Sequence, residues 1–176
     1  MKAKTYYLVF LFFLLGWTTT WAQISKEYDV STPGSLSQLM GTDKNTITDL
    51  ILTGTLNSTD FQTIKGMTVL KNLDLENVHL EDDLLPAGAF QGKTLSKITL
   101  PVSLKSIGIS AFQNATFDEI DFSKSPDLSQ INQAAFKDAK VKPNNTLNFS
   151  QNLKLSDFTT TQWLTGTFSG YAGKVI

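Results

Sequence analysis

Few residues of this chain could do chemistry. His79 is the only histidine, and Asp82 and Asp83 follow it closely. With one of the many serines they could make up a Ser-His-Asp arrangement, but no serine lies in G-x-S-x-G or in another motif that positions a nucleophile. One histidine and no cysteine exclude a metal site made of several histidines or of thiolates. We therefore predict that the protein is not an enzyme and uses no cofactor, and that His79 is a solvated loop residue.

The charged residues are nearly balanced and of restricted type. Fifteen basic side chains stand against sixteen acidic ones, and all fifteen are lysines. Without arginine the chain lacks the planar group that binds phosphate through two parallel hydrogen bonds, so nucleic acid is not an expected partner. Without cysteine no disulfide can form, and the fold has to rest on apolar packing.

The first 22 residues are predicted to be a signal peptide. Lys2 and Lys4 precede an apolar run over residues 6–17, which is shorter than the ~20 residues that cross a bilayer. Small residues at positions 20 and 22 fit a cleavage site that would leave Gln23 first. The sequence thus predicts a secreted, periplasmic or cell-surface protein that has no transmembrane segment after cleavage and no cysteine for a lipid anchor.

An internal repeat is predicted over residues 46–176. A triplet of the form apolar-x-apolar recurs at intervals of 22 to 27 residues, and in four of the five units another apolar residue stands three positions earlier. Alternation along a strand sends the two apolar residues inward and the middle one outward, so stacked units would build one parallel sheet. The triplets are residues 50–52, 73–75, 98–100, 120–122 and 147–149.

A second marker, the pair Ala-Phe, keeps step with the triplets. It occurs at residues 89–90, 111–112 and 135–136, and the first two phenylalanines each precede a triplet by eight residues. Two markers with a fixed phase rarely arise by chance. We expect these phenylalanines to pack in the core rather than to form an aromatic binding stripe.

The two ends of the repeat region differ from its middle. Residues 23–45 are expected to form an N-terminal cap, in which Leu36, Leu39 and Met40 have helical spacing and predict a short capping helix. At the other end Phe168 resembles the marker, and Ile176 follows it by eight residues. The last repeat is therefore expected to be incomplete.

The unit at residues 94–115, TLSKITLPVSLKSIGISAFQNA, resembles the BspA-like leucine-rich repeat. That repeat reads roughly L-x-x-I-x-L-P-x-x-apolar-x-x-I-G-x-x-A-F, and the resemblance covers residues 46–140. The following unit has Asn132 where this one has Gly108. We attribute the exchange to a left-handed backbone position, which asparagine tolerates better than most residues.

The resemblance implies an α/β-type repeat solenoid. It would be a right-handed leucine-rich repeat coil of about five repeats, with a short-stranded parallel sheet. Proteins of this family are typically secreted or surface-exposed and are linked to attachment to host or matrix components. A non-catalytic protein that binds protein or glycan is the expected function, and the alternative is a truncated structural protein that self-associates through its uncapped C-terminal end.

The outward strand positions form the candidate binding face. Such an acidic, hydroxyl-rich surface would suit a cationic partner, calcium or carbohydrate. The same composition is also that of any solvated strand face, which is the simpler interpretation. The candidate residues are Asp49, Asn72, Asp74, Glu76, Lys97, Thr99, Glu119, Asp121 and Asn148.

Overall fold

The computed structural model describes residues 23–142, 146–147 and 174–175. The predicted signal peptide and the marker at Phe168 lie outside these residues, and so does the predicted end of the last repeat at Ile176.

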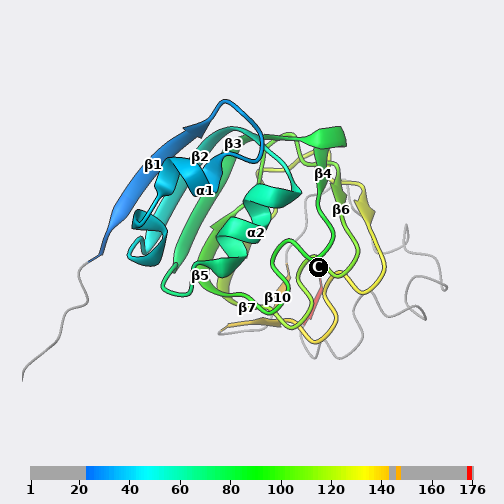
Figure 1. Cartoon of the computed structure of the whole chain (residues 1–176). Coiled ribbons are helices and arrows are strands. Elements are labelled where there is room, and N and C mark those ends of the chain that lie inside the picture. The colour runs from blue at the N-terminus through cyan, green and yellow to red at the C-terminus, as the bar shows by residue number, and fades with distance from the viewer. Residues whose placement is uncertain (1–22, 143–145, 148–173, 176) are drawn as a thin grey trace, which may run out of the picture.

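A six-stranded parallel sheet runs through the described part of the chain (Figure 1). Its order is β1-β2-β3-β5-β7-β9, so each unit adds its strand beside the strand of the unit before. Every neighbouring pair is parallel, as the repeat predicts. The strands are β1 (Ser25–Val30), β2 (Asp49–Leu56), β3 (Asn72–Leu80), β5 (Thr94–Thr99), β7 (Thr116–Asp121) and β9 (Lys140–Val141).

Two smaller parallel sheets accompany the large one. The first has the order β4-β6-β8 and takes one two-residue strand from each of three successive units. The second joins β10 to β11. Repeats with a parallel sheet and few helices fit a repeat α/β fold; the right-handed solenoid coil stays a prediction. The strands are β4 (Leu84–Leu85), β6 (Ser106–Ile107), β8 (Gln130–Ile131), β10 (Thr146–Leu147) and β11 (Lys174–Val175).

The helices lie near the N-terminal end of the repeats. Figure 1 shows α1 (Leu36–Met40) and α2 (Ser58–Gly66) on one face of the large sheet. Two 3-10 turns, η1 (Asp43–Asn45) and η2 (Glu81–Asp83), complete the elements of the described residues. A helix at α1 agrees with the expected spacing, while its capping role stays a prediction. The triplet pattern does not predict α2.

The large sheet begins one strand earlier than expected. Residues 23–45 were expected to form only a cap with a helix, but they also contribute β1, which pairs with β2 from Ser25 opposite Asp49 to Val30 opposite Gly54. In β1 only Val30 is fully buried. An edge strand needs little apolar surface, so hydrophobic periodicity did not reveal it.

The core forms as the two markers predict. Both apolar residues of the triplets at 50–52, 73–75, 98–100 and 120–122 are buried, at 0–7% exposure. The phenylalanines of the Ala-Phe pairs form a column inside the repeats. Ring centroids lie 5.5 Å apart for Phe90 and Phe112 and 5.0 Å apart for Phe112 and Phe136, and both pairs are stacked. Phe61 of α2 extends this column with an edge-on contact to Phe90 at 5.6 Å.

The strands differ from the expected units in length and in one position. β2 and β3 have eight and nine residues, because their pairing resumes after a bulge and continues to Leu56 and Leu80. The strand that follows β7 is β9, not the predicted triplet at 147–149. Val141 follows its Phe136 by five residues, the interval that also separates Phe112 from Phe117. The five-residue interval from the phenylalanine of each Ala-Phe pair into the next strand would therefore have predicted β9.

The left-handed positions also differ from the expectation. Neither Gly108 nor Asn132 has a positive φ. Glycine is needed at 108 because a Cβ there would lie 2.4 Å from the carbonyl oxygen of Leu85. Asn132 instead donates from its side chain to the carbonyl oxygen of Ile107 at 2.9 Å. The left-handed residues, with φ from 55 to 70°, flank the Ala-Phe pairs: Gly88, Gly92, Ser110, Asn114, Ala134 and Asp138.

A buried lysine links the repeats to α2. Lys93 is only 7% exposed, and its ammonium donates to the carbonyl oxygen of Met67, the residue that follows α2. Burial lowers the pKa of Lys93 from 10.5 to about 8. The charged form is thus disfavoured in the folded protein.

We expect this lysine to make stability depend on pH. Between pH 8 and 10.5 the unfolded chain keeps a proton on Lys93 that the folded protein loses, so stability should rise through this window, by roughly 3 kcal/mol in all. Urea unfolding between about pH 7 and pH 10 measures the rise. Lys93→Met should abolish it, whereas Lys65→Met, which removes a partly buried donor to Gly88, should keep it. An equal rise in Lys93→Met would contradict the assignment.

Candidate functional site

Most of the predicted binding residues lie on the face of the large sheet away from the helices. Strand register aligns seven of the nine in two rows across the sheet. Each unit contributes one residue to each row, because equivalent positions of successive units are Cα partners. The first row is Ser25, Asp49, Asn72, Lys97 and Glu119, and the second row is Glu27, Ile51, Asp74, Thr99 and Asp121.

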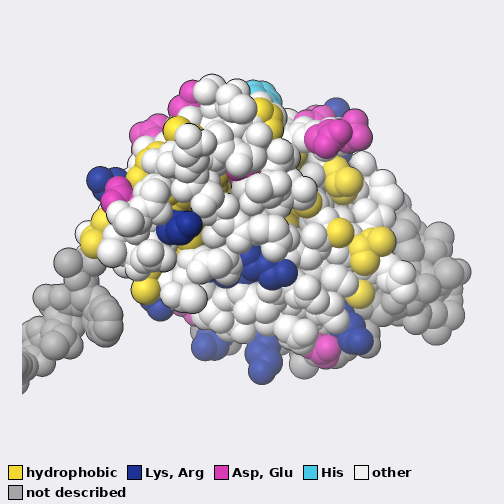
Figure 2. Space-filling view, in the orientation of Figure 1, with side chains coloured by type: hydrophobic (Ala, Val, Ile, Leu, Met, Phe, Trp, Pro, Cys, Tyr) yellow, Lys and Arg dark blue, Asp and Glu magenta, His cyan; other side chains and the backbone are white. Residues whose placement is uncertain are grey.

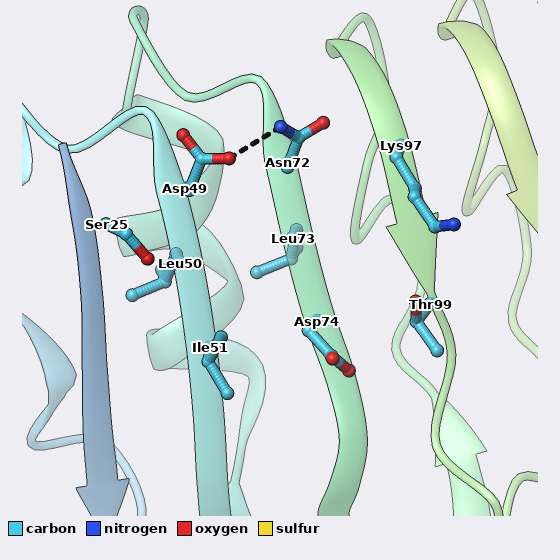
Figure 3. A pocket seen from close by; sticks show the side chains of 9 residues that line it. All are labelled: Ser25, Asp49, Leu50, Ile51, Asn72, Leu73, Asp74, Lys97 and Thr99. Carbon is cyan, nitrogen blue, oxygen red and sulfur yellow. Dashed lines mark hydrogen bonds between the residues drawn. The ribbon is translucent and has the colours of Figure 1, made fainter. Parts of the chain in front are cut away.

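Asp49 is the best-anchored residue of the first row. Its Oδ1 accepts from Asn72 Nδ2 at 2.6 Å and from Gln23 Nε2 at 2.8 Å, and its Oδ2 accepts from Thr48 Oγ1 at 2.6 Å (Figure 3 shows the Asn72 bond). Burial raises the pKa of Asp49, but the three hydrogen bonds outweigh this effect and hold the pKa below its usual range. Asp49 is therefore a charged, fixed part of the surface.

Two ion pairs neutralise other charges of this face. Lys97 Nζ lies 2.7 Å from Glu119 Oε1, its neighbour in the first row. Lys124, from the turn after β7, lies 2.6 Å from Glu76 Oε2. The face is consequently less acidic than its strand residues alone suggest, and it includes Lys124, which the strand pattern does not predict.

The second row differs because it combines an apolar side chain with a carboxylate. Ile51 is 38% exposed, although most large apolar side chains of the described repeats are buried. Its neighbour Asp74 accepts at Oδ1 from the backbone N–H of Glu76 at 2.9 Å. Ile51 was the middle residue of its triplet and so was expected to point outward, which the structure confirms.

A shallow depression of about 290 Å³ lies between these rows. Figure 3 shows its lining side chains on β1, β2, β3 and β5. Its size is near the lower end of small-molecule sites, and its form suits one side chain of a partner rather than an enclosed ligand. The lining residues are Ser25, Asp49, Leu50, Ile51, Asn72, Leu73, Asp74, Lys97 and Thr99.

The structure brings five of the nine candidate residues together in this depression: Asp49, Asn72, Asp74, Lys97 and Thr99. Glu76 and Glu119 lie beside it in ion pairs. Thr99 was expected to be exposed but is only 7% exposed, because its short side chain lies between strands on both sides. The side chain of Asp121 and the whole of Asn148 lie outside what the structure describes.

Two further hollows flank the sheet. One, of about 650 Å³, lies at the start of the strands, where Thr48, Thr68, Lys71 and Ser96 join Asp49. The other, of about 280 Å³, lies near η2 and β4. The first hollow shares Asp49 and Asn72 with the depression, so the polar surface continues past the strand ends.

His79 takes no part in this site. It is exposed and lies on β3 rather than in a loop, because β3 continues beyond its bulge. Figure 2 shows the histidine at the molecular surface. Asp83 pairs with Lys105 Nζ at 2.7 Å, and this hydrogen bond is the main cause that lowers the pKa of Asp83. The neighbouring carboxylate is thus engaged elsewhere, and no hydrogen bond joins it to His79 in the described residues.

Two kinds of feature are absent from the part of the chain that the structure describes. Within 23–142, 146–147 and 174–175, no group of three or more His, Asp or Glu side chains could hold a metal ion. In the same part of the chain no helix is long and apolar enough to cross a membrane.

Residues 83–159 match the family model of the BspA type leucine rich repeat region, in six copies. The match confirms the resemblance, and its six copies lie in a range that holds three of the five expected triplets, those at 98–100, 120–122 and 147–149. It starts after β3, so of the residues lining the depression only Lys97 and Thr99 fall within it. No curated protein matches the chain.

Proposed function

We propose that this chain is a non-catalytic binding protein that receives a protein partner on the helix-free face of its large sheet. The match of residues 83–159 to BspA type leucine-rich repeats supports the proposal. Secretion or display at the cell surface and a role in adhesion to host or matrix components belong to the same proposal. The family supports protein binding in general, and the face is chosen from its geometry.

The observation that carries the proposal is the exposed Ile51 within the depression. A large apolar side chain on a strand face loses contact with water only when another molecule covers it. Around it lie anchored polar groups, Asp49 and Asn72, and paired charges, Lys97 with Glu119. An apolar centre inside a polar rim is the usual anatomy of a protein interface.

An array of matrix proteins and glycans, probed with the purified chain, tests the proposal. Ile51→Arg should lower binding to the protein spots about tenfold or more, because a bulky charge would enter the centre of the interface. Ile109→Arg is the matched control, since Ile109 is 53% exposed and lies after β6, and it should bind like the wild type.

Equal binding by both variants and the wild type would refute the proposed face. A loss of binding to glycan spots alone would replace the protein partner by a carbohydrate. Unfolding midpoints of the two variants, measured beforehand, show that both are folded.

A further inference from the structure

We infer that the second row of the face binds a lysine side chain of an extended peptide segment, with its stem on Ile51 and its ammonium at Asp74. This inference rests on the proposed function and names the chemistry of the partner. It follows from which charges of the face are already paired.

Charges in and beside the first row are paired within the protein. Lys97 pairs with Glu119, Lys124 pairs with Glu76, and Asp49 accepts three hydrogen bonds. A ligand that bound to these groups would compete with these contacts.

Two carboxylates of the second row, Asp74 and Glu27, are not paired in this way. Asp74 and Glu27 form no ion pair with the residues that the structure describes. Register places Glu27 on one side of Ile51 and Asp74 on the other. Strands lie about 4.8 Å apart, so a carboxylate stands on each side of the exposed apolar residue within the length of a lysine stem.

The hydrogen bond that Asp74 already accepts favours lysine over arginine as its ligand. Asp74 Oδ1 already accepts the backbone N–H of Glu76 at 2.9 Å, so a guanidinium bound to both oxygens would share Oδ1 with that N–H. A guanidinium gains most from two parallel bonds to both carboxylate oxygens, whereas an ammonium is a point donor that one oxygen satisfies. The aliphatic stem of lysine also covers Ile51, which is 38% exposed.

Calcium and carbohydrate fit this row less well. Calcium takes six to eight oxygen ligands, and the described residues hold no group of three acidic or histidine side chains placed for a metal. A neutral sugar could donate hydroxyl hydrogen bonds to Asp74 but would bring no opposite charge. A cationic side chain supplies both the charge and the apolar contact.

Fluorescence anisotropy with short labelled peptides tests the inference. The probe is a hexapeptide of alternating threonine and lysine with blocked ends, compared with peptides that carry glutamine or arginine in place of lysine. The lysine peptide should bind, and Asp74→Asn should weaken it about fivefold. Glu27→Gln together with Asp74→Asn should weaken it by about tenfold or more.

The matched control is Asp138→Asn, which makes the same charge change on an exposed turn at φ 56°, where asparagine is tolerated. It should bind within about twofold of the wild type. Absence of binding up to about 1 mM, equal affinity for the glutamine or arginine peptide, or no effect of Asp74→Asn would each overturn the lysine assignment. The array experiment with Ile51→Arg tests the binding face independently of these peptides. The proposed face is therefore kept if the array supports it and only the lysine assignment fails.

Discussion

Replacement of Asp60 by alanine should lower the free energy of unfolding by about 3 to 5 kcal/mol. The carboxylate of Asp60 is fully buried. It accepts from the backbone N–H groups of Gly34 at 2.6 Å, Leu36 at 3.0 Å and Asn57 at 3.0 Å. Alanine would leave all three donors without this acceptor, and the lost bond from Asn57 is half of the capping box that starts α2.

Urea unfolding followed by circular dichroism measures this loss. Asp60→Asn keeps one acceptor oxygen and should lose less than the alanine variant. Asp138→Asn, on an exposed turn, should stay within about 0.5 kcal/mol of the wild type. A loss of under about 1 kcal/mol for Asp60→Ala would mean that this carboxylate does not tie the N-terminal loop to α2.

Replacement of Phe112 by alanine is expected to cost about 3 to 5 kcal/mol. Its ring is fully buried and contacts four other rings, with centroid distances of 5.0 to 6.4 Å to Phe90, Phe117, Phe122 and Phe136. The substitution removes the apolar contacts and leaves a cavity between three successive units.

The unfolding free energy of Phe112→Ala is compared with that of two other variants. Phe112→Leu keeps most of the buried volume and should cost about half as much or less. Ile109→Ala removes a 53% exposed side chain three residues away and should be nearly neutral. Similar losses for Phe112→Ala and Ile109→Ala would show that the column of rings contributes little to stability.

The repeat could be predicted because each of its two markers has a physical cause. Apolar residues at alternate strand positions have to face the core, which set the inward side of Leu73 and Leu75 and the outward side of Asp74. The Ala-Phe pairs had to pack between units, and Phe90, Phe112 and Phe136 do so.

The missed elements have weaker or different signals. β1 is an edge strand with one fully buried residue, so no apolar pattern marks it. α2 does carry a sign in the sequence, because Asn57 and Asp60 have the spacing of a capping box. Its apolar residues are few, and the triplet pattern around it predicted strands only.

The candidate site was predictable in outline but not in its charge balance. Register follows from the repeat, so the rows through Asp49 and Asp74 could be expected. The pair of Lys124 with Glu76 joins residues 48 positions apart, and it depends on the path of a turn that no periodicity determines. Only the structure therefore shows which carboxylates of this face are already in ion pairs.

The row arrangement also makes this face easy to change over evolutionary time. Each row takes one outward side chain from each unit, while the inward neighbours hold the core together. A substitution at an outward position such as Ile51 or Asp74 would change this surface without opening a cavity. Duplication of a unit would lengthen both rows by one residue, so the surface can diversify in a lineage, or in a designed library, while the scaffold stays the same.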